Sequence, residues 1–230
     1  MRSGRRQPHR PKTAVLHAGY HPAQSHGVVT PPEHRSSTMA FSTAAKGERA
    51  FDLAWGKKTA DRGEQSEYIY ARLSHPDAAL VEQRLRGMEP GAGGALVFSS
   101  GMSAITGLFL SLWRSNALPA GSHLLYTNPV YGGTEDFFAT DATRLGFVPH
   151  AVRTDDLTAT AQAMDQITRQ GGKLAMVYLE TPANPTLSMT DIPAVAAMAK
   201  AQNRRCLVVV DNTFFGLFQQ PFMISPDVDV

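Results

Sequence analysis

Two kinds of hydrophobic pattern alternate along the chain from residue 77 onward. Short, nearly continuous apolar runs are typical of buried strands, whereas longer stretches with an apolar residue at every third or fourth position are typical of amphipathic helices. The first helix is expected to begin at Asp77, which can cap it, and to end before Pro90. The expected strands cover residues 95–98, 123–127, 147–152, 174–179 and 207–210. The other expected helices cover residues 102–113, 134–145, 157–169 and 192–202.

This alternation predicts an α/β fold with a mostly parallel sheet and helices on both of its faces. Strands that are separated by helical stretches need crossover connections, and crossover helices cover the sheet. In such folds, ligands bind beyond the carboxyl ends of the strands. We therefore expect the functional residues to lie directly after the strands.

The first part of the chain, residues 1–61, has little sustained periodicity and is rich in Pro, His, Ser, Thr and Gly. A segment of this composition cannot form its own core, so we expect a largely irregular N-terminal arm. Its aromatic residues, such as Phe41 and Trp55, suggest that the arm docks on a neighbouring surface. Residues 62–230 are expected to form the α/β domain.

The composition narrows the class of protein. The chain has 22 basic and 20 acidic residues and a formal net charge of +2, so its charge indicates neither nucleic acid nor an anionic membrane as a partner. No apolar run approaches the length of a membrane span. Cys206 is the single cysteine, which excludes an internal disulfide, and its apolar neighbours predict that it is buried. We expect a soluble cytoplasmic protein.

Two of the predicted strand ends carry features that suit a flat anionic ligand. Ser100, Gly101 and Met102 open a helix, where free backbone N–H groups can hold an anion, although a simple glycine turn explains the same residues. Tyr131 precedes two glycines, so its ring could stack on a planar ligand, or it could fill the loop.

The two later strand ends carry an amide and a carboxylate. Asn184 stands between Pro182 and Pro185, which hold the loop rigid and could orient a polar ligand, or merely stiffen a turn. Asp211 directly follows an aliphatic strand, and a carboxylate there is costly unless it meets a cation or several donors. It could keep a pyridine nitrogen protonated or cap the following segment. Together, the four strand ends describe a site for a phosphorylated, planar, pyridine-like cofactor.

From residue 13 to its end the chain resembles the cystathionine synthase/lyase family of pyridoxal-phosphate enzymes, also called the Cys/Met metabolism family. This resemblance implies the large domain of the aspartate-aminotransferase-like fold (fold type I), here incomplete, with pyridoxal phosphate as the cofactor. The segments that carry it are Tyr70-Ala71-Arg72, Ser100-Gly101-Met102, Tyr131-Gly132, Glu180-Thr181-Pro182-Ala183-Asn184-Pro185 and Asp211-Asn212-Thr213.

The resemblance also implies a role for each matching residue. Ser100 and the amides of Gly101 and Met102 would bind the cofactor phosphate. Tyr131 would stack on the ring and act as an acid or base, and Asp211 would pair with the ring nitrogen. Asn184 would lie near the ring hydroxyl and the substrate carboxylate, whereas Glu180 would support the loop.

Two further matches imply that the active site is shared between subunits. Tyr70 and Arg72 would reach the phosphate in a neighbouring subunit, so the functional unit would be a homodimer or homotetramer. The chain departs from the family pattern at His75-Pro76-Asp77 and at Phe214-Phe215-Gly216, which leaves the subgroup open.

The family's Schiff-base lysine is expected beyond Asp211, and no lysine follows Asp211 in this chain. The lysines present are Lys12, Lys46, Lys57, Lys58, Lys173 and Lys200. We therefore expect the chain as given to be an inactive fragment. The complete protein is expected to perform γ-elimination or γ-replacement on sulfur amino acids or activated homoserine.

Two other classes of function stay open at this stage, and a third is not expected. A non-catalytic binding or regulatory chain could keep the cofactor site without its chemistry. A dinucleotide-binding domain is disfavoured because the glycines at 91, 93 and 94 precede a predicted strand rather than follow one. A metal enzyme is disfavoured because His17 and His21 lack an HExxH pattern, so no metal site is predicted.

Overall fold

The computed structural model describes residues 11–61, 64 and 67–230. The chain divides into two compact units. Unit 1 comprises the described residues up to Met88 together with Gly93–Val97. Unit 2 comprises Glu89–Ala92 and Phe98–Val230.

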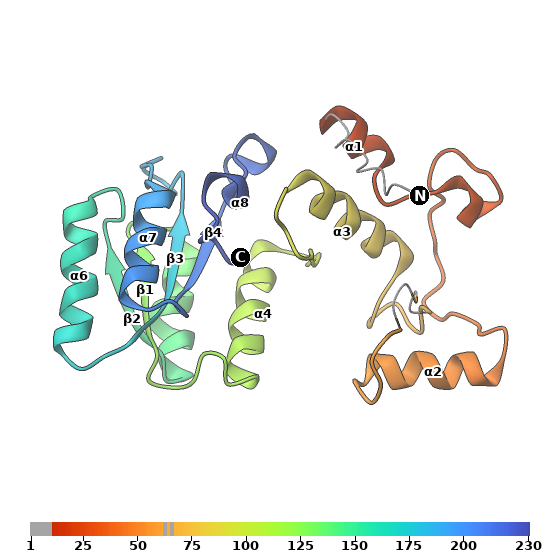
Figure 1. The fold of residues 1–230 in the computed structure, drawn as a ribbon, viewed down its shortest axis with the longest axis horizontal. Helices are drawn as coiled ribbons and strands as arrows, with labels where there is room; N and C mark the ends of the chain where they lie inside the picture. The colour runs from red at the N-terminus through yellow and green to blue at the C-terminus, as the bar shows by residue number, and fades with distance from the viewer. Residues whose placement is uncertain (1–10, 62–63, 65–66) are drawn as a thin grey trace, which may run out of the picture. The chain divides into compact units, whose positions relative to one another are not determined.

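Unit 2 is built around a parallel sheet, which confirms the predicted fold class. Within the described residues the sheet has four strands in the order β2-β1-β3-β4, and all pairs are parallel (Figure 1). The strands are β1 (His123–Thr127), β2 (Val148–Val152), β3 (Leu174–Glu180) and β4 (Leu207–Asp211). In the β3–β4 register Glu180 lies beside Asp211, so the two carboxylates end neighbouring strands.

The helices of unit 2 follow the sequence prediction closely where the periodicity is strong. Its elements are α4 (Gly101–Arg114), α5 (Gly132–Asp136), the π-helix η2 (Phe137–Ala142), α6 (Leu157–Arg169), α7 (Ile192–Gln202), η3 (Gly216–Phe218) and α8 (Pro221–Ile224). Helices α6 and α7 have the predicted bounds. The helix predicted at 134–145 begins two residues earlier and continues into η2.

Two buried clusters cover the two faces of the sheet. On one face, Met164 of α6 and Val195 of α7 pack with Val177 and Val208 of the strands. Cys206 belongs to this cluster and is fully buried, as predicted, and burial raises the pKa of its thiol to about 12. The cluster on the other face is rich in aromatic residues. The predicted cover of helices on both faces is thereby confirmed (Figure 1).

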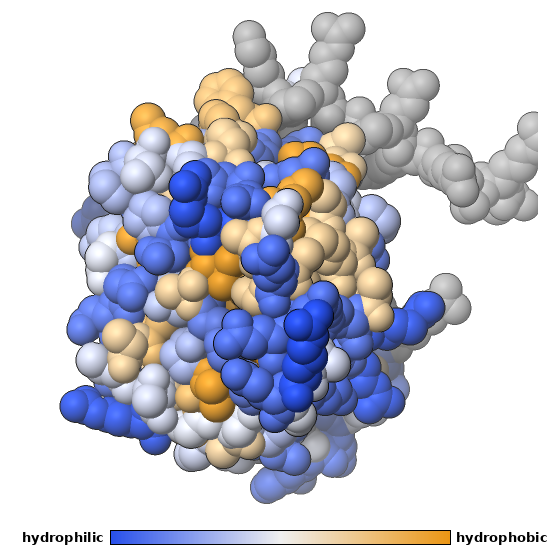
Figure 2. Space-filling view, turned by 90° about the vertical axis from the view of Figure 1, so that its left-hand side faces the viewer, coloured by the Kyte–Doolittle hydropathy of each residue, from blue (hydrophilic) through white to orange (hydrophobic). Residues whose placement is uncertain are grey.

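The second cluster joins α4 and η2 to the opposite face of the sheet. Phe109 of α4 contacts Phe137 and Phe138 of η2, with ring centroids 5.2 and 5.4 Å apart. Phe138 in turn stacks on Tyr126 of β1 and meets the ring of Tyr178 of β3 edge-on. Figure 2 shows an outer face of the molecule on which hydrophilic residues predominate and hydrophobic residues gather in small patches.

The prediction of a strand at residues 95–98 is wrong. The structure has no strand there, and the side chain of Leu96 is 76% exposed. The backbone N–H of Val97 donates to the carboxylate of Glu82 (3.1 Å) rather than to a neighbouring strand. An apolar run becomes a strand only when another strand supplies its backbone hydrogen bonds, and among the described residues none does so.

Unit 1 consists of helices joined by irregular segments. They are α1 (Pro11–His17), η1 (Pro22–Ser25), α2 (Ala44–Ala54) and α3 (Pro76–Met88). Arg84 of α3 donates to the carbonyls of Leu16 and Ala18, which fastens the end of α1 to α3. Residues 1–10 of the predicted N-terminal arm lie outside the described residues, and the rest of the arm contains α1, η1 and α2.

The predicted capping role of Asp77 is also wrong. Helix α3 begins at Pro76, so Asp77 lies within its first turn. Its carboxylate accepts from the backbone N–H of His34 (3.1 Å) and contacts the His34 ring (2.7 Å). Sequence spacing does not reveal such a partner, which lies 43 positions earlier in the chain.

No described helix combines the length and the hydropathy needed to cross a membrane.

One histidine of β1 and one histidine of β2 form a stacked pair. The rings of His123 and His150 stack with an interplanar angle of 12°, and Nδ1 of His123 lies 2.9 Å from Nε2 of His150. Gly172 leaves room for the pair, because a Cβ there would lie 2.5 Å from Nε2 of His123. Burial, and then the neighbouring His123, lower the pKa of His150.

We expect His150 to make folding less stable in mild acid. The unfolded chain takes up a proton near the ordinary histidine pKa of about 6.5, whereas folded His150 resists protonation, so stability is complete above that pH and falls as the pH decreases. Because the pair is partly exposed, we expect an effect below about 1 kcal/mol. Urea unfolding of wild type and His150→Phe at pH 7, 6 and 5 measures it. An unchanged pH slope in the variant would contradict this expectation.

Candidate functional site

The candidate site lies at the carboxyl edge of the sheet in unit 2, where Asp211 ends β4. Its Oδ1 atom accepts from the backbone N–H (3.1 Å) and the hydroxyl (2.6 Å) of Thr213. Its Oδ2 atom accepts from the phenol of Tyr178 (2.7 Å). Three donors thus offset the cost of removing this half-buried carboxylate from water. The bond from the Thr213 amide is the local capping contact that the sequence left open.

Tyr178 is a site residue that the sequence analysis missed. Its side chain is only 2% exposed and projects from the middle of β3. Burial, followed by the charge and hydrogen bond of Asp211, raises its pKa well above the ordinary value, so the phenol stays protonated and donates. A signal was present: a buried tyrosine in an otherwise aliphatic strand needs a partner for its hydroxyl.

Glu180 joins two of the loops that the sequence singled out. Its Oε1 atom accepts from the backbone N–H groups of Asn184 (2.6 Å) and Tyr131 (3.1 Å), and Oε2 also accepts from Tyr131 (3.2 Å). The side chain is 3% exposed. Burial raises its pKa and Asp211 adds to that effect, whereas the two N–H groups act in the opposite direction. One buried carboxylate therefore fixes the backbone at both positions.

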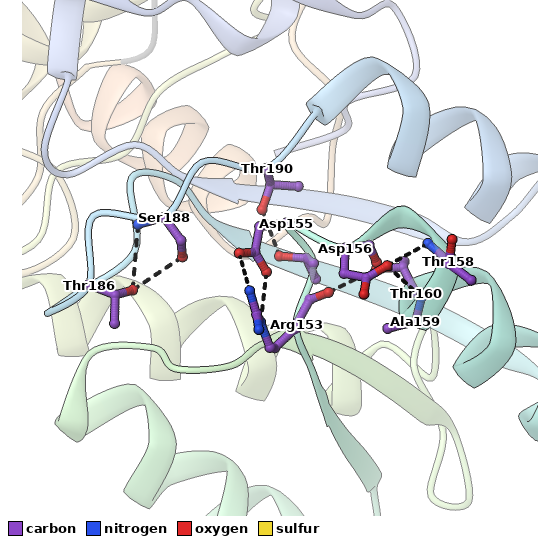
Figure 3. Close-up of polar contacts among 10 residues, drawn as sticks. Arg153, Asp155, Asp156, Thr158, Ala159, Thr160, Thr186, Ser188 and Thr190 are labelled. Atoms are coloured by element: carbon purple, nitrogen blue, oxygen red, sulfur yellow. Dashed lines mark hydrogen bonds and ion pairs between the residues drawn. The ribbon is translucent and has the colours of Figure 1, made fainter.

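Buried threonines hold the segment that carries Asn184 against the sheet. The hydroxyl of Thr154 lies 2.9 Å from that of Thr127 and 2.6 Å from that of Thr190. Thr190 also donates its N–H to the hydroxyl of Thr181, and Thr127 accepts from the N–H of Glu180. Figure 3 shows Thr190 with the polar contacts around it. Because these buried hydroxyls all have hydrogen-bond partners, the network favours a single position of the loop that carries Asn184.

Polar residues on the surface complete this region. Arg153 and Asp155 form an ion pair (2.9 Å), and Asp156 caps the start of α6 by accepting from the N–H groups of Thr158 and Ala159 (Figure 3). These contacts fix the turn between β2 and α6 rather than any of the predicted cofactor residues.

The start of α4 presents unbonded backbone donors beside open space. The hydroxyl of Ser100 accepts from the N–H of Ser103 (3.1 Å), and the first backbone bond runs from Ala104 to Ser100. The N–H groups of Gly101 and Met102 precede that first intrahelical bond. A Cβ added at Gly101 would meet no atom within 4 Å, so space for a ligand exists there.

Tyr131 and Met102 are brought together over Gly133. A Cβ at Gly133 would lie 2.7 Å from Cε1 of Tyr131 and 3.2 Å from Sδ of Met102. Glycine is therefore required for the tyrosine ring to lie where it does. The ring is 48% exposed and available to a ligand. The thioether also approaches the hydroxyl of Thr134, at 4.0 Å.

Contacts within unit 2 connect four of the residues that the sequence predicts for the site: Met102, Tyr131, Asn184 and Asp211. Ser100 and Gly101 directly precede Met102. The other two, Tyr70 and Arg72, belong to unit 1. Tyr70 forms an isolated antiparallel bridge with Thr38, and the Arg72 guanidinium lies 5.0 Å from the centre of the Tyr70 ring.

The arrangement offers donors for an anion, an exposed aromatic residue and the half-buried carboxylate of Asp211. No group of three or more His, Cys, Asp or Glu side chains in the described part of the chain is placed to hold a metal ion.

Similarity to known proteins shows which family the chain belongs to. Residues 12–230 match the family described as Cys/Met metabolism PLP-dependent enzyme. The chain is 34% identical over 219 residues to an L-methionine gamma-lyase of Pseudomonas deceptionensis, covering 95% of this chain and 49% of that protein. It is 33% identical over 219 residues to a cystathionine gamma-synthase of Mycobacterium tuberculosis, covering 95% and 48%. The chain spans about half the length of the curated relatives it matches.

Solved structures give the same result for the fold. The structure of metB from Corynebacterium glutamicum has a TM-score of 0.74 at 30% identity, covering 94% of this chain and 49% of that chain. The cystathione gamma lyase CalE6 of Micromonospora echinospora has a TM-score of 0.73 at 31% identity, with 94% and 49% covered. The chain thus contains an incomplete part of their fold, and it belongs to the Cys/Met metabolism family of enzymes that depend on pyridoxal phosphate.

Proposed function

We propose that the protein containing this chain carries out γ-elimination or γ-replacement on sulfur amino acids or activated homoserine with pyridoxal phosphate. The observation that carries the proposal is the linked set of Tyr131, Asn184 and Asp211 at one edge of the sheet, beside the open start of α4. Relatives named as a methionine gamma-lyase and a cystathionine gamma-synthase support the same class of reaction.

The residues of unit 2 fit the proposed cofactor. The free N–H groups of Gly101 and Met102, next to Ser100, suit its phosphate, because the start of a helix favours an anion. The open space at Gly101 leaves room for that group. The exposed ring of Tyr131 suits stacking on a pyridine, and the carboxylate of Asp211 suits its nitrogen.

When it is bound, pyridoxal phosphate supplies an acceptor for the electrons that remain after a proton leaves the substrate's α carbon. In the proposal, Asp211 contributes by keeping the ring nitrogen protonated. Tyr131 holds the ring by stacking, and its hydroxyl accepts or donates a proton near the substrate. Asn184 orients the ring hydroxyl and the substrate carboxylate with its amide.

Neither lysine of unit 2 is proposed to bind the cofactor. Unit 2 contains two lysines. Lys173 precedes β3, at the opposite end of that strand from the site. Lys200 is held by the carbonyl of Cys206 (2.8 Å) and the carboxylate of Asp229 (2.6 Å). Neither follows a strand at its carboxyl end.

A shared site between two subunits is also part of the proposal. Tyr70 and Arg72 both have exposed side chains, which supports a role at the phosphate of a neighbouring subunit. The assembly would be a cytoplasmic homodimer or homotetramer that acts on small amino-acid substrates.

The activity of the complete protein tests this proposal. We expect it to release a 2-oxo acid and ammonia from methionine or homocysteine, together with methanethiol or hydrogen sulfide, respectively. Alternatively, we expect it to join a thiol to activated homoserine with release of the activating group as its free acid. Asp211→Asn should lower kcat/KM at least about 100-fold, because a neutral amide no longer favours a protonated ring. Asp165→Asn, a carboxylate on α6 that contacts Gln202, is the matched control and should be unaffected.

Two outcomes would count against the proposal. Wild-type turnover in Asp211→Asn would show that this carboxylate does not serve the reaction. Cofactor binding without conversion of any of these substrates would favour the non-catalytic binding chain instead.

Replacing Glu180 should loosen both loops at once. Glu180→Ala leaves the partly buried N–H groups of Tyr131 and Asn184 without an acceptor, which should lower the free energy of unfolding by about 1 to 3 kcal/mol. Urea unfolding measures this loss, and amide hydrogen exchange should become faster at residues 131 and 184.

Glu135→Ala is the matched control for Glu180. The side chain of Glu135 accepts from the phenol of Tyr126 and, unlike that of Glu180, bonds neither loop N–H; the bond from its backbone N–H to the carbonyl of Tyr131 remains in the variant. Exchange at residues 131 and 184 should stay as in wild type. Equal acceleration by both variants would show that Glu180 has no special role in holding these loops.

A further inference from the structure

The hydrogen bonds of Asp211 leave one acceptor position for a ligand. An ionised carboxylate has about four lone-pair sites, two on each oxygen. Thr213 supplies two donors to Oδ1, its N–H and its hydroxyl. Tyr178 supplies one donor to Oδ2. The remaining site is therefore on Oδ2, the oxygen that the phenol already holds.

We propose that Tyr178 is a positioning residue that aims the free lone pair of Asp211 Oδ2 at a cationic ring N–H of the cofactor. This inference rests on the proposed function, since it takes pyridoxal phosphate as the ligand. Tyr178 does not touch the cofactor in this role and acts through the carboxylate of Asp211.

The phenol is suited to this task because it is immobile. Its ring is 2% exposed and meets Phe138 edge-on, with centroids 5.4 Å apart. A buried tyrosine in tight packing loses little further freedom when it holds a partner. It therefore restricts the rotation of the Asp211 side chain at little additional entropic cost.

The charges around the phenol favour donation rather than acceptance. The carboxylates of Asp211 and Glu180 both act on Tyr178 and raise its pKa, after the larger effect of burial. A hydrogen bond with the hydroxyl of Thr134 acts in the opposite direction and lowers the pKa of Tyr178. The proton of Tyr178 thus stays on the bond to Asp211.

Tyr126 provides a matched control within the same sheet. It is the register partner of Tyr178 across β1 and β3, and it packs on the same Phe138 ring. Its side chain is 4% exposed, and its phenol donates to Oε1 of Glu135 (3.0 Å). Tyr126→Phe removes a comparable buried hydroxyl without altering the bonds of Asp211.

Ligand discrimination tests the proposal without any need for turnover. The probes are pyridoxamine 5′-phosphate, which has no aldehyde to react with lysines, and its analogue with CH in place of the ring nitrogen. Calorimetry gives the dissociation constant of each for wild type, Tyr178→Phe and Tyr126→Phe. The ratio of the two constants reports the contact with the ring nitrogen and cancels the contribution of the phosphate.

We expect wild type to bind the nitrogen-containing probe more tightly than its analogue. In Tyr178→Phe the ratio of the two dissociation constants should be about tenfold closer to one, because a charge-assisted hydrogen bond no longer orients the carboxylate. Tyr126→Phe should keep the wild-type ratio. In Asp211→Asn the preference should be lost, and adding Tyr178→Phe to it should change the ratio no further.

The contrary results distinguish failure of the positioning role from failure of the proposed function. A wild-type ratio in Tyr178→Phe, an equal loss in Tyr126→Phe, or a further loss in the double variant would overturn the positioning role. Failure of wild type to bind pyridoxamine 5′-phosphate would instead overturn the proposed function, and this inference with it.

Discussion

The candidate site depends on two carboxylates that lie side by side at the end of a parallel sheet, one buried (Glu180) and one half-buried (Asp211). The β3–β4 register alone places Glu180 next to Asp211, and like charges at that distance repel one another. The structure accommodates them by giving each its own donors: backbone N–H groups for Glu180, and hydroxyls with one amide for Asp211. These two donor sets define the two sides of the site, one that fixes loops and one that remains open to a ligand.

The two carboxylates differ in the kind of donor that satisfies them, and this difference assigns their tasks. Glu180 accepts from the main-chain N–H groups of two different loops, which carry Tyr131 and Asn184, so it links residues 131 and 184. Asp211 accepts from the Tyr178 phenol of the neighbouring strand β3 and from Thr213, so its bonds set its own orientation without joining two loops. A carboxylate in the second situation can exchange contacts with a bound molecule while the surrounding backbone stays in place.

Much of this arrangement was predictable from local pattern, and the remainder was not, for identifiable reasons. Helices α6 and α7 follow from their apolar spacing, and the strand ends carrying Tyr131, Asn184 and Asp211 follow from the α/β alternation. The strand at 95–98 failed because strands depend on partners elsewhere, and the Asp77 cap failed because His34 competes for its carboxylate. Tyr178 was missed because its role arises from the register between β3 and β4, which no single segment encodes.

The deep burial of Cys206 has a practical consequence for studying this chain. Its thiol belongs to the core between α7 and the sheet, and its pKa of about 12 leaves almost no thiolate at neutral pH. Alkylating reagents and thiol-reactive spin labels should therefore leave Cys206 unmodified while the fold is intact. A cysteine engineered at an exposed position such as Thr186 would be the uniquely reactive thiol, so spectroscopic labels can be placed on the loop of Asn184 without first removing the native residue.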